Sequence, residues 1–227
     1  MDPFRTQAAP ADWVVIATGL AALVVTTVRR LWLPARNAVT IAHEGGHGLV
    51  ALLTRRRLEA IRLHSDTSGL TVTRGRPTGP GVVLTLAAGY PAPSLLGLGG
   101  AALIGTDRIT LALWIGSALL LALLVTVRNA YGVLTVLLSA AAFLLVSWLG
   151  SPAVQAAFAC AGVWFLLLGG VRPAFELQAR RRRGGAPDSD ADQLARLTQV
   201  PAGVWLFFFH AVAICALIGG GRWLLGI

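Results

Sequence analysis

The sequence predicts an all-α, polytopic membrane protein with about seven transmembrane helices and a small cytoplasmic β-hairpin after the second helix. Hydrophobic residues make up 56% of the 227 residues, and charged residues make up only 13%. Soluble domains carry about 25% charged residues, so this composition excludes an ordinary soluble protein. Apolar runs close to the length needed to cross a bilayer, about 20 residues, recur along the chain. We therefore expect one integral membrane domain over residues 1–227.

Seven apolar segments, each bounded by charged or turn-forming residues, are the candidate transmembrane helices. They cover residues 13–28, 38–53, 81–104, 109–127, 132–149, 153–170 and 202–217, and the last can extend to Leu225. The fifth and sixth are separated only by Gly150, Ser151 and Pro152, which is typical of a tight turn. The apolar surface of these segments predicts the lipid bilayer as a partner.

The first long polar connection, residues 54–80, predicts a β-hairpin. Residues 58–64 and 69–74 both show partial alternation of apolar and polar side chains. The intervening Ser65-Asp66-Thr67-Ser68 is rich in residues that favour turns, and this arrangement is typical of two antiparallel strands.

The second long polar connection, residues 171–200, is strongly charged. It contains the basic run Arg180–Arg183, followed by aspartates at positions 188, 190 and 192. Ser189 or Asp190 can cap a short helix over residues 191–197, because Ser and Asp side chains accept hydrogen bonds from the first free N–H groups of a helix.

The arginines predict the orientation of the chain. With the N-terminus in the cytoplasm, 14 of the 19 basic residues, Arg5 among them, fall on the cytoplasmic side, as the positive-inside rule requires. Both polar connections are then cytoplasmic and the C-terminus is external, in the cell membrane of a bacterium. The net charge of +9 does not indicate a nucleic-acid partner, since the arginines flank apolar spans, where topology and anionic lipid headgroups explain them.

The most informative motif is His43-Glu44-Gly45-Gly46-His47, which lies inside the second apolar segment. Residues four apart lie on one face of a helix, so the two imidazoles can hold one metal ion. The Glu between them can act as general base on a metal-bound water, the arrangement of zinc metalloproteases. Ionisable residues are costly in a membrane segment, so their presence indicates a functional site.

A catalytic zinc site usually has three protein ligands, so a third ligand must come from elsewhere in the chain. Candidates are His64 and Asp66 in the hairpin, the aspartates at positions 188, 190 and 192, and His210 in the last apolar segment. Asp190 is favoured, since it lies at the edge of the membrane at a depth that the second helix also reaches. The three aspartates could instead be solvated charges that offset the Arg run. His210 is better explained as a hydrogen-bonded buried histidine or as a partner of a ligand.

These motifs resemble those of the site-2 protease family of intramembrane zinc metalloproteases, in particular its compact bacterial branch without a PDZ domain. The resemblance covers residues 38–93, with the motif, the hairpin and Ala88-Gly89-Tyr90-Pro91-Ala92-Pro93, and residues 188–205. It implies one Zn2+ per chain, held by His43, His47 and Asp190, with Glu44 as catalytic base.

The resemblance also implies a membrane-anchored protein substrate, cleaved near the cytoplasmic face. Gly89, Tyr90 and Pro91 would form part of the substrate-facing wall, and an edge strand that includes Leu70 and Val72 could pair with an extended substrate. The chain departs from the family pattern in that Ala191, rather than Gly, follows Asp190. Two alternatives are a zinc-binding membrane scaffold without hydrolysis and, less favoured, a metal or proton transporter, which would need more polar residues in the middle spans.

Overall fold

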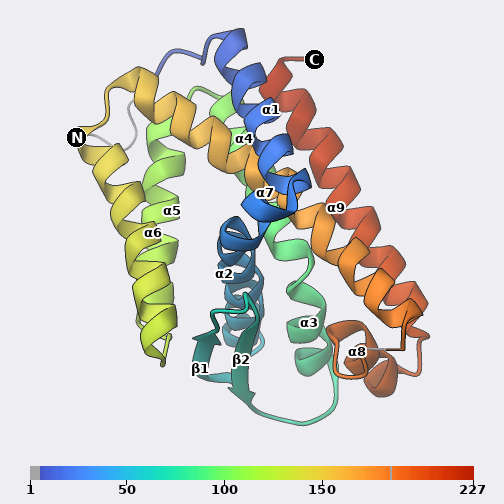
Figure 1. Cartoon of the computed structure of the whole chain (residues 1–227). Helices are drawn as coiled ribbons and strands as arrows, with labels where there is room; N and C mark the ends of the chain where they lie inside the picture. Colours follow the sequence, from blue (N-terminus) through green and yellow to red (C-terminus); the bar gives the residue numbers. More distant parts are fainter. Residues whose placement is uncertain (1–5, 185) are drawn as a thin grey trace.

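A computed structural model describes residues 6–184 and 186–227; Arg5, which the topology prediction places in the cytoplasm, lies outside them. The described chain is mainly helical, with one two-stranded sheet (Figure 1). In chain order the elements are α1 (Asp12–Thr27), α2 (Arg29–Leu53), β1 (Arg57–Leu63), β2 (Gly69–Arg74), α3 (Pro80–Ala88), α4 (Pro91–Gly105), α5 (Ile109–Leu124), α6 (Ala130–Leu149), α7 (Pro152–Arg182), α8 (Asp190–Thr198) and α9 (Ala202–Leu225).

The candidate membrane spans are fewer than the seven predicted. Among the described residues, α6, α7 and α9 are long and apolar enough to cross a membrane. The pairs α1–α2 and α3–α4 also qualify if each counts as one span, although they bend by 102° and 66°. That gives three to five candidate spans, and α5, with 16 residues, is shorter than a span requires. The fold class of a polytopic helical membrane protein holds, and the count of seven is not confirmed.

The two bends have local causes. Val28 adopts extended backbone angles (φ −76°, ψ 113°) between α1 and α2, so the helix stops there and restarts in a new direction. The second bend follows Gly89, and α4 begins at Pro91, whose missing N–H is tolerated in the first turn of a helix. Hydropathy alone does not detect the second bend, because α3 and α4 are both apolar.

The prediction that residues 171–200 form a connection between helices is wrong for residues 171–182. Helix α7 continues through Pro173 to Arg182 instead of ending near Gly170. Its polar extension is held by side-chain contacts: Glu176 accepts hydrogen bonds from the Trp32 indole at 3.0 Å and from Arg172 at 2.8 Å. Helix α2 likewise begins at Arg29, nine positions before the predicted start at Ala38, and this added segment carries Trp32.

The hairpin forms as predicted: β2 has the predicted bounds, and β1 begins and ends one residue earlier than predicted. β1 and β2 pair antiparallel, with Ile61 opposite Thr71 and Leu63 opposite Gly69. Ile61 and Leu63 are buried against α2 and α6, in a small core with Ile41, Val127 and Val136. This core fixes the hairpin beside the helix that carries the motif.

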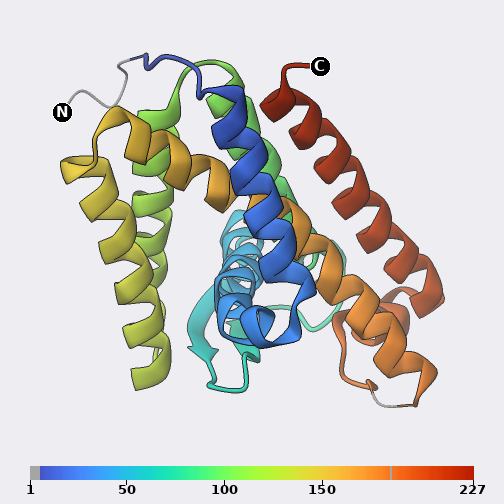
Figure 2. The same ribbon diagram turned by 45° about the horizontal axis from the view of Figure 1, so that its top comes forward.

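The layout places the sheet, α3 and α8 at the same end of the molecule, away from the start of α1 and the C-terminus (Figure 1). In the turned view, α9 and the α5–α6 pair lie on opposite sides of α1 and α7 (Figure 2). Helix α8 packs through Ala191 and Leu194 into a core shared with α7 and α9. As a result, α2, β2, α3 and α8 surround one region, although α8 is distant from the others in sequence.

Candidate metal centre

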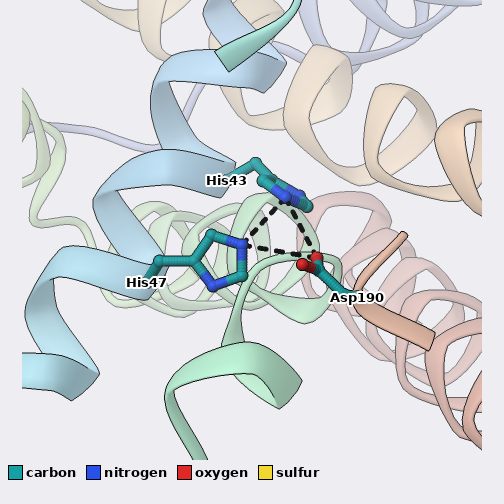
Figure 3. A group of neighbouring side chains, drawn as sticks. All are labelled: His43, His47 and Asp190. Carbon is teal, nitrogen blue, oxygen red and sulfur yellow. Dashed lines mark hydrogen bonds and ion pairs between the residues drawn. The ribbon is translucent and has the colours of Figure 1, made fainter. Parts of the chain in front are cut away.

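Helix α2 places His43 and His47 one turn apart on one face, and α8 places the carboxylate of Asp190 against both rings (Figure 3). The two Nε2 atoms are 3.1 Å apart, and each is 3.3 Å from Asp190 Oδ2. Among the described residues, this is the group of His, Cys, Asp and Glu whose ligand atoms lie close enough together to share one metal ion.

The triangle of donor atoms fits a tetrahedral zinc ion. Zinc binds His nitrogen and carboxylate oxygen at about 2.0–2.2 Å, so two ligand atoms on one tetrahedral ion are about 3.3 Å apart. The three edges found here, 3.1 to 3.3 Å, match that separation. The donor set, two imidazoles and one carboxylate, is also one that zinc uses in catalytic sites.

The hydrogen bond on the far side of His47 supports the same conclusion. Its Nδ1 lies 2.7 Å from the backbone carbonyl oxygen of Thr85 in α3. A carbonyl oxygen can only accept, so Nδ1 carries the hydrogen and, in the neutral ring, Nε2 presents a lone pair. That lone pair faces Asp190 Oδ2, which is also an acceptor. A proton on Nε2 or a metal ion between the two atoms satisfies this arrangement, and a backbone carbonyl is a typical partner for a metal-ligating histidine.

Asp190 is prepared to act as an anionic ligand. Its burial would raise the pKa of the carboxyl, but the adjacent His47 and His43 rings outweigh this and hold the pKa well below its usual range. The carboxyl group is therefore ionised at neutral pH, which is the form that binds a metal.

Two glycines allow the backbone to approach this group closely. A Cβ atom at Gly89 would lie 2.4 Å from His47 Nε2 and 2.7 Å from His43 Cε1. A Cβ atom at Gly69 in β2 would lie 2.4 Å from Glu44 Oε1. Any side chain at either position would overlap the candidate ligands or the candidate base. The space at Gly89 is thus a cradle beside the donor atoms that a methyl group would fill.

Glu44 is buried on α2 and is held from the sheet. The residue is 5% exposed, and Thr71 Oγ1 donates a 2.6 Å hydrogen bond to its Oε2. The same hydroxyl lies 3.2 Å from the backbone carbonyl oxygen of Glu44. Strand β2 therefore determines how the carboxylate of Glu44 points.

The position of Asp190 depends on a set of contacts around the start of α8. Ser189 caps the helix, as predicted: its hydroxyl accepts from the N–H of Asp192 and donates to Asp192 Oδ2 at 2.6 Å. Arg181, from the end of α7, forms an ion pair with the same carboxylate. We refer to Arg181, Ser189 and Asp192 as the α8 clamp. It joins two elements on either side of the α7–α8 connection.

Two cavities open beside the candidate centre. The larger, about 670 Å³, is lined by His43, Glu44, His47 and Asp190 together with residues of β2, α3 and α8. The smaller, about 360 Å³, lies between the end of α7 and the segment before α8. His43 and Asp190 line both, so the candidate ligands are reachable from two sides.

The remaining predicted residues are distributed around these cavities. Leu70 and Val72 line the larger cavity, and Tyr90 lines the smaller one and packs edge-on against His43, with ring centroids 4.9 Å apart. Pro91 is buried at the start of α4. His210 donates from Nδ1 to the Leu206 carbonyl and packs against Phe175 of α7, which are not contacts with the ligand group.

The other candidate third ligands lie elsewhere. His64 and Asp66 both contact Ser68 in the hairpin turn. The side chain of Asp188 is 96% exposed and lies 4.0 Å from Arg196. Asp192 belongs to the α8 clamp.

Sequence reasoning missed four residues that contact the candidate centre or support it: Thr71, Thr85, Gly69 and Arg181. Thr71 could have been identified from the alternation of side chains in β2, because in a strand Thr71 faces the opposite side of the sheet from Leu70 and Val72. Thr85 acts through its backbone carbonyl, which no side-chain pattern reveals.

Comparison with known proteins gives one match that covers most of the chain. The model of the Peptidase M50B-like family matches residues 16–220, a range that includes the motif of α2, the hairpin and Asp190. No curated protein and no solved structure matches significantly.

Proposed function

Because the chain belongs to the Peptidase M50B-like family, the family of site-2 proteases, we propose that it is a zinc-dependent endopeptidase of the cell membrane. It would hydrolyse a peptide bond of a membrane-anchored protein near the cytoplasmic face. The observation that carries this proposal is the triangle formed by His43, His47 and Asp190, with edges of 3.1 to 3.3 Å, next to the buried carboxylate of Glu44.

Three atoms would hold the zinc ion: Nε2 of His43, Nε2 of His47 and Oδ2 of Asp190. Bound zinc supplies Lewis-acid chemistry, which polarises a carbonyl group and lowers the pKa of water toward 7. The protein keeps these atoms in place with the Thr85 carbonyl behind His47 and the α8 clamp behind Asp190.

Glu44 would be the general base. Its carboxylate takes a proton from the attacking water and passes it to the nitrogen that leaves when the peptide bond breaks. The Thr71 hydroxyl occupies Oε2, which leaves Oε1 for proton transfer. Gly69 provides the space in which that oxygen lies.

The substrate would bind in the larger cavity as an extended segment. An amide inside a helix is shielded by its own hydrogen bonds, so the substrate must unwind locally before hydrolysis. The backbone of β2 can pair with the unwound segment by strand addition, while Leu70 and Val72 contact its side chains. Tyr90, beside His43, lines the smaller cavity, where it would form part of the substrate-facing wall on the other side of the candidate ligands.

The proposed orientation has the N-terminus in the cytoplasm and the C-terminus outside. The hairpin and α8 lie at the same end of the molecule (Figure 1), and most arginines belong to this end or its loops. This supports a reaction close to the cytoplasmic surface, where water reaches the cavities.

The first experiment measures zinc in detergent-purified protein. Wild type is expected to hold about one zinc per chain, and Asp190→Ala is expected to lose most of it. Asp188→Ala is the matched control. It also removes a carboxylate, two positions before Asp190, and the side chain of Asp188 is 96% exposed. Absence of zinc from wild type under metal-replete conditions would overturn the proposal.

The second experiment tests the reaction itself. Glu44→Gln keeps the size of the side chain and removes its basicity, so cleavage of a membrane-anchored test substrate should stop while zinc content stays at the wild-type level. A biological activity that survives Glu44→Gln would instead favour a zinc-binding scaffold. Metal flux into liposomes that depends on His43 and His47 would favour a transporter.

A further inference from the structure

The two edges of the β-hairpin are treated differently by the rest of the chain. The outer edge of β1 is covered by the short connection between α5 and α6, residues 125–129. The Ile61 N–H donates to the Thr126 carbonyl at 3.0 Å, and the Ile61 carbonyl accepts from the Arg128 N–H at 2.9 Å. These bonds form a parallel bridge between Ile61 and Val127.

Asn129 extends this cover with its side chain. Its Oδ1 accepts from the Leu63 N–H at 3.1 Å, and its Nδ2 donates to the Leu63 carbonyl at 2.6 Å. The carboxamide thus reproduces the donor and acceptor of a peptide unit, and Leu63 is paired as it would be by a neighbouring strand. The outward-facing groups of both Ile61 and Leu63 are then satisfied.

The space for this side chain depends on Gly132, in the first turn of α6. A Cβ atom there would lie 2.7 Å from Asn129 Oδ1 and 3.4 Å from the Leu63 nitrogen. Gly132 is thus a second residue on which the pairing of Asn129 with Leu63 depends.

The outer edge of β2, in contrast, is not covered by another described segment. Within residues 6–184 and 186–227, the backbone of Leu70–Thr73 has hydrogen-bond partners in β1 alone. This free edge lines the cavity of about 670 Å³ that also contains His43, Glu44 and His47. A free strand edge is a template for pairing with another extended chain.

We propose that Asn129 is a positioning residue for the substrate: it fastens the outer edge of β1 to the α5–α6 pair, so that β2 presents its free edge to the substrate in fixed register beside Glu44. This inference rests on the proposed function, because the extended segment is taken to be the substrate. It also gives the α5–α6 pair a role, which is to hold the sheet from the side opposite the cavity.

The test uses cysteine cross-linking at matched positions on the two strands. Leu70 and Arg62 lie opposite each other in the two strands. A cysteine at either position is therefore at the same height along the strands, and the two differ only in their distance from a strand added outside β2. A strand added outside β2 lies about 4.8 Å from Leu70 and about 9.6 Å from Arg62. A disulfide needs a Cα–Cα distance of about 4.4–6.8 Å, so only the adjacent strand can be linked.

The protein for this test is the full chain in detergent, with Cys215→Ser to remove the exposed native thiol and Glu44→Gln to prevent cleavage. The probe is a synthetic transmembrane peptide of about 20 apolar residues, with a central Gly-Pro break and one cysteine beside it. Leu70→Cys is expected to form a disulfide with the probe, and Arg62→Cys is expected to form very little. Adding Asn129→Ala or Gly132→Ala should lower the ratio of Leu70 to Arg62 cross-linking at least threefold.

Gly162→Ala is the control, because a Cβ atom there meets nothing within 4 Å. Zinc content of each variant shows that the fold is retained, and Gly132→Ala keeps the test decisive if Asn129→Ala fails to fold. Three outcomes would overturn the proposal. They are an unchanged ratio in both variants, equal cross-linking at both strands with Asn129 present, and no cross-linking at either strand. Expected cross-linking without any cleavage by the Glu44-containing protein would overturn the protease function. The role of Asn129 would then be limited to holding β2 in register for a bound extended segment.

Discussion

The hydroxyl group of Thr71 lies 2.6 Å from the carboxylate of Glu44 and donates a hydrogen bond to it. The two residues belong to different elements, β2 and α2, so this bond joins the strand that lines the larger cavity to the helix that carries the motif. A carboxylate that is buried and hydrogen-bonded on one oxygen has a restricted orientation. The strand proposed to receive the substrate is thus also the strand that orients the proposed base.

Thr71→Val is expected to lower kcat about tenfold, because removal of a hydrogen bond to a charged group costs about 1.5–3 kcal/mol and part of that loss appears in the barrier. Valine has nearly the same shape as threonine, so zinc content should not change. Thr71→Ser restores the hydroxyl and should restore most of the rate. Thr135→Val is the control, since the Thr135 hydroxyl donates only within α6. Equal rates for Thr71→Val and Thr71→Ser would show that the hydroxyl does not act on Glu44.

Gly89→Ala is expected to abolish zinc binding, although residue 89 contributes no ligand. Its backbone angles (φ −58°, ψ −62°) suit any residue, so the change tests space alone. The new methyl group would lie 2.4 Å from His47 Nε2 and 2.7 Å from His43 Cε1, too close for both rings to keep their positions. Zinc content per chain is the measurement, with Gly99→Ala as control, because a Cβ atom there meets nothing within 4 Å. Retention of full zinc by Gly89→Ala would mean that the metal is not held at these nitrogens.

The hairpin and the start of α8 are the parts that the sequence predicts best. Strand alternation and turn-forming residues define the hairpin to within one residue at each end of β1 and β2. The N-cap of α8 is predicted as Ser189 or Asp190, and Ser189 occupies it, because capping depends on one side chain and its local geometry. In both cases the information is contained within a few consecutive residues.

The predicted number of spans is not confirmed, because the length of an apolar segment does not show whether the helix changes direction within it. The bend at Gly89 lies between two apolar helices, so α3 and α4 are read as one span. The polar residues after Val28 separate two apolar segments in the sequence without showing that α2 begins at Arg29 in a new direction. The polar end of α7 was missed for the opposite reason. Its Arg172 and Glu176 look like loop charges in the sequence, and only the distant Trp32 shows that they pack in a helix.

In the candidate centre, too, local sequence predicts some residues, and the contacts between distant elements are not predictable from sequence spacing. His43, Glu44 and His47 follow from one motif on one helix. The contact of Asp190 with both rings depends on how α7 ends and how α8 packs, which no spacing determines. The expected depth at the membrane edge favours Asp190, and the resemblance strengthens that choice over Asp188 and Asp192. The geometry supports that choice, because those two side chains form ion pairs with arginines instead.

Arg181→Gln is expected to weaken zinc binding about threefold, although the guanidinium contacts no ligand atom. It removes the ion pair with Asp192, which anchors the first turn of α8 and with it Asp190. The effect is modest because both side chains are partly exposed, and such pairs contribute at most about 1 kcal/mol. Competition with a zinc-binding dye measures the affinity. Arg182→Gln removes a neighbouring exposed charge and should have no effect. A similar loss in both variants would indicate a general effect of the basic run and not of the α8 clamp.

Removal of zinc is expected to lower the thermal midpoint of the wild-type protein by about 10 °C. A ligand at a thousand times its Kd stabilises the folded state by about 4 kcal/mol, and for a chain of this size each kcal/mol shifts the midpoint by about 2–4 °C. The reason for a large effect is that the ion would join α2 to α8, a nine-residue helix whose other attachments include Ala191, Leu194 and the α8 clamp. Thermal unfolding is measured with and without a chelator.

The matched control for zinc removal is Asp190→Ala, whose midpoint should barely respond to the chelator, because the third ligand is already absent. Asp188→Ala should respond as wild type does. Limited proteolysis near residues 183–200 should increase in the chelated wild type and in Asp190→Ala, since α8 loses the same link in both. A chelator that lowers the midpoint of wild type and Asp190→Ala equally would mean that the stabilising metal lies elsewhere. In that case the triangle of His43, His47 and Asp190 would not be the zinc site.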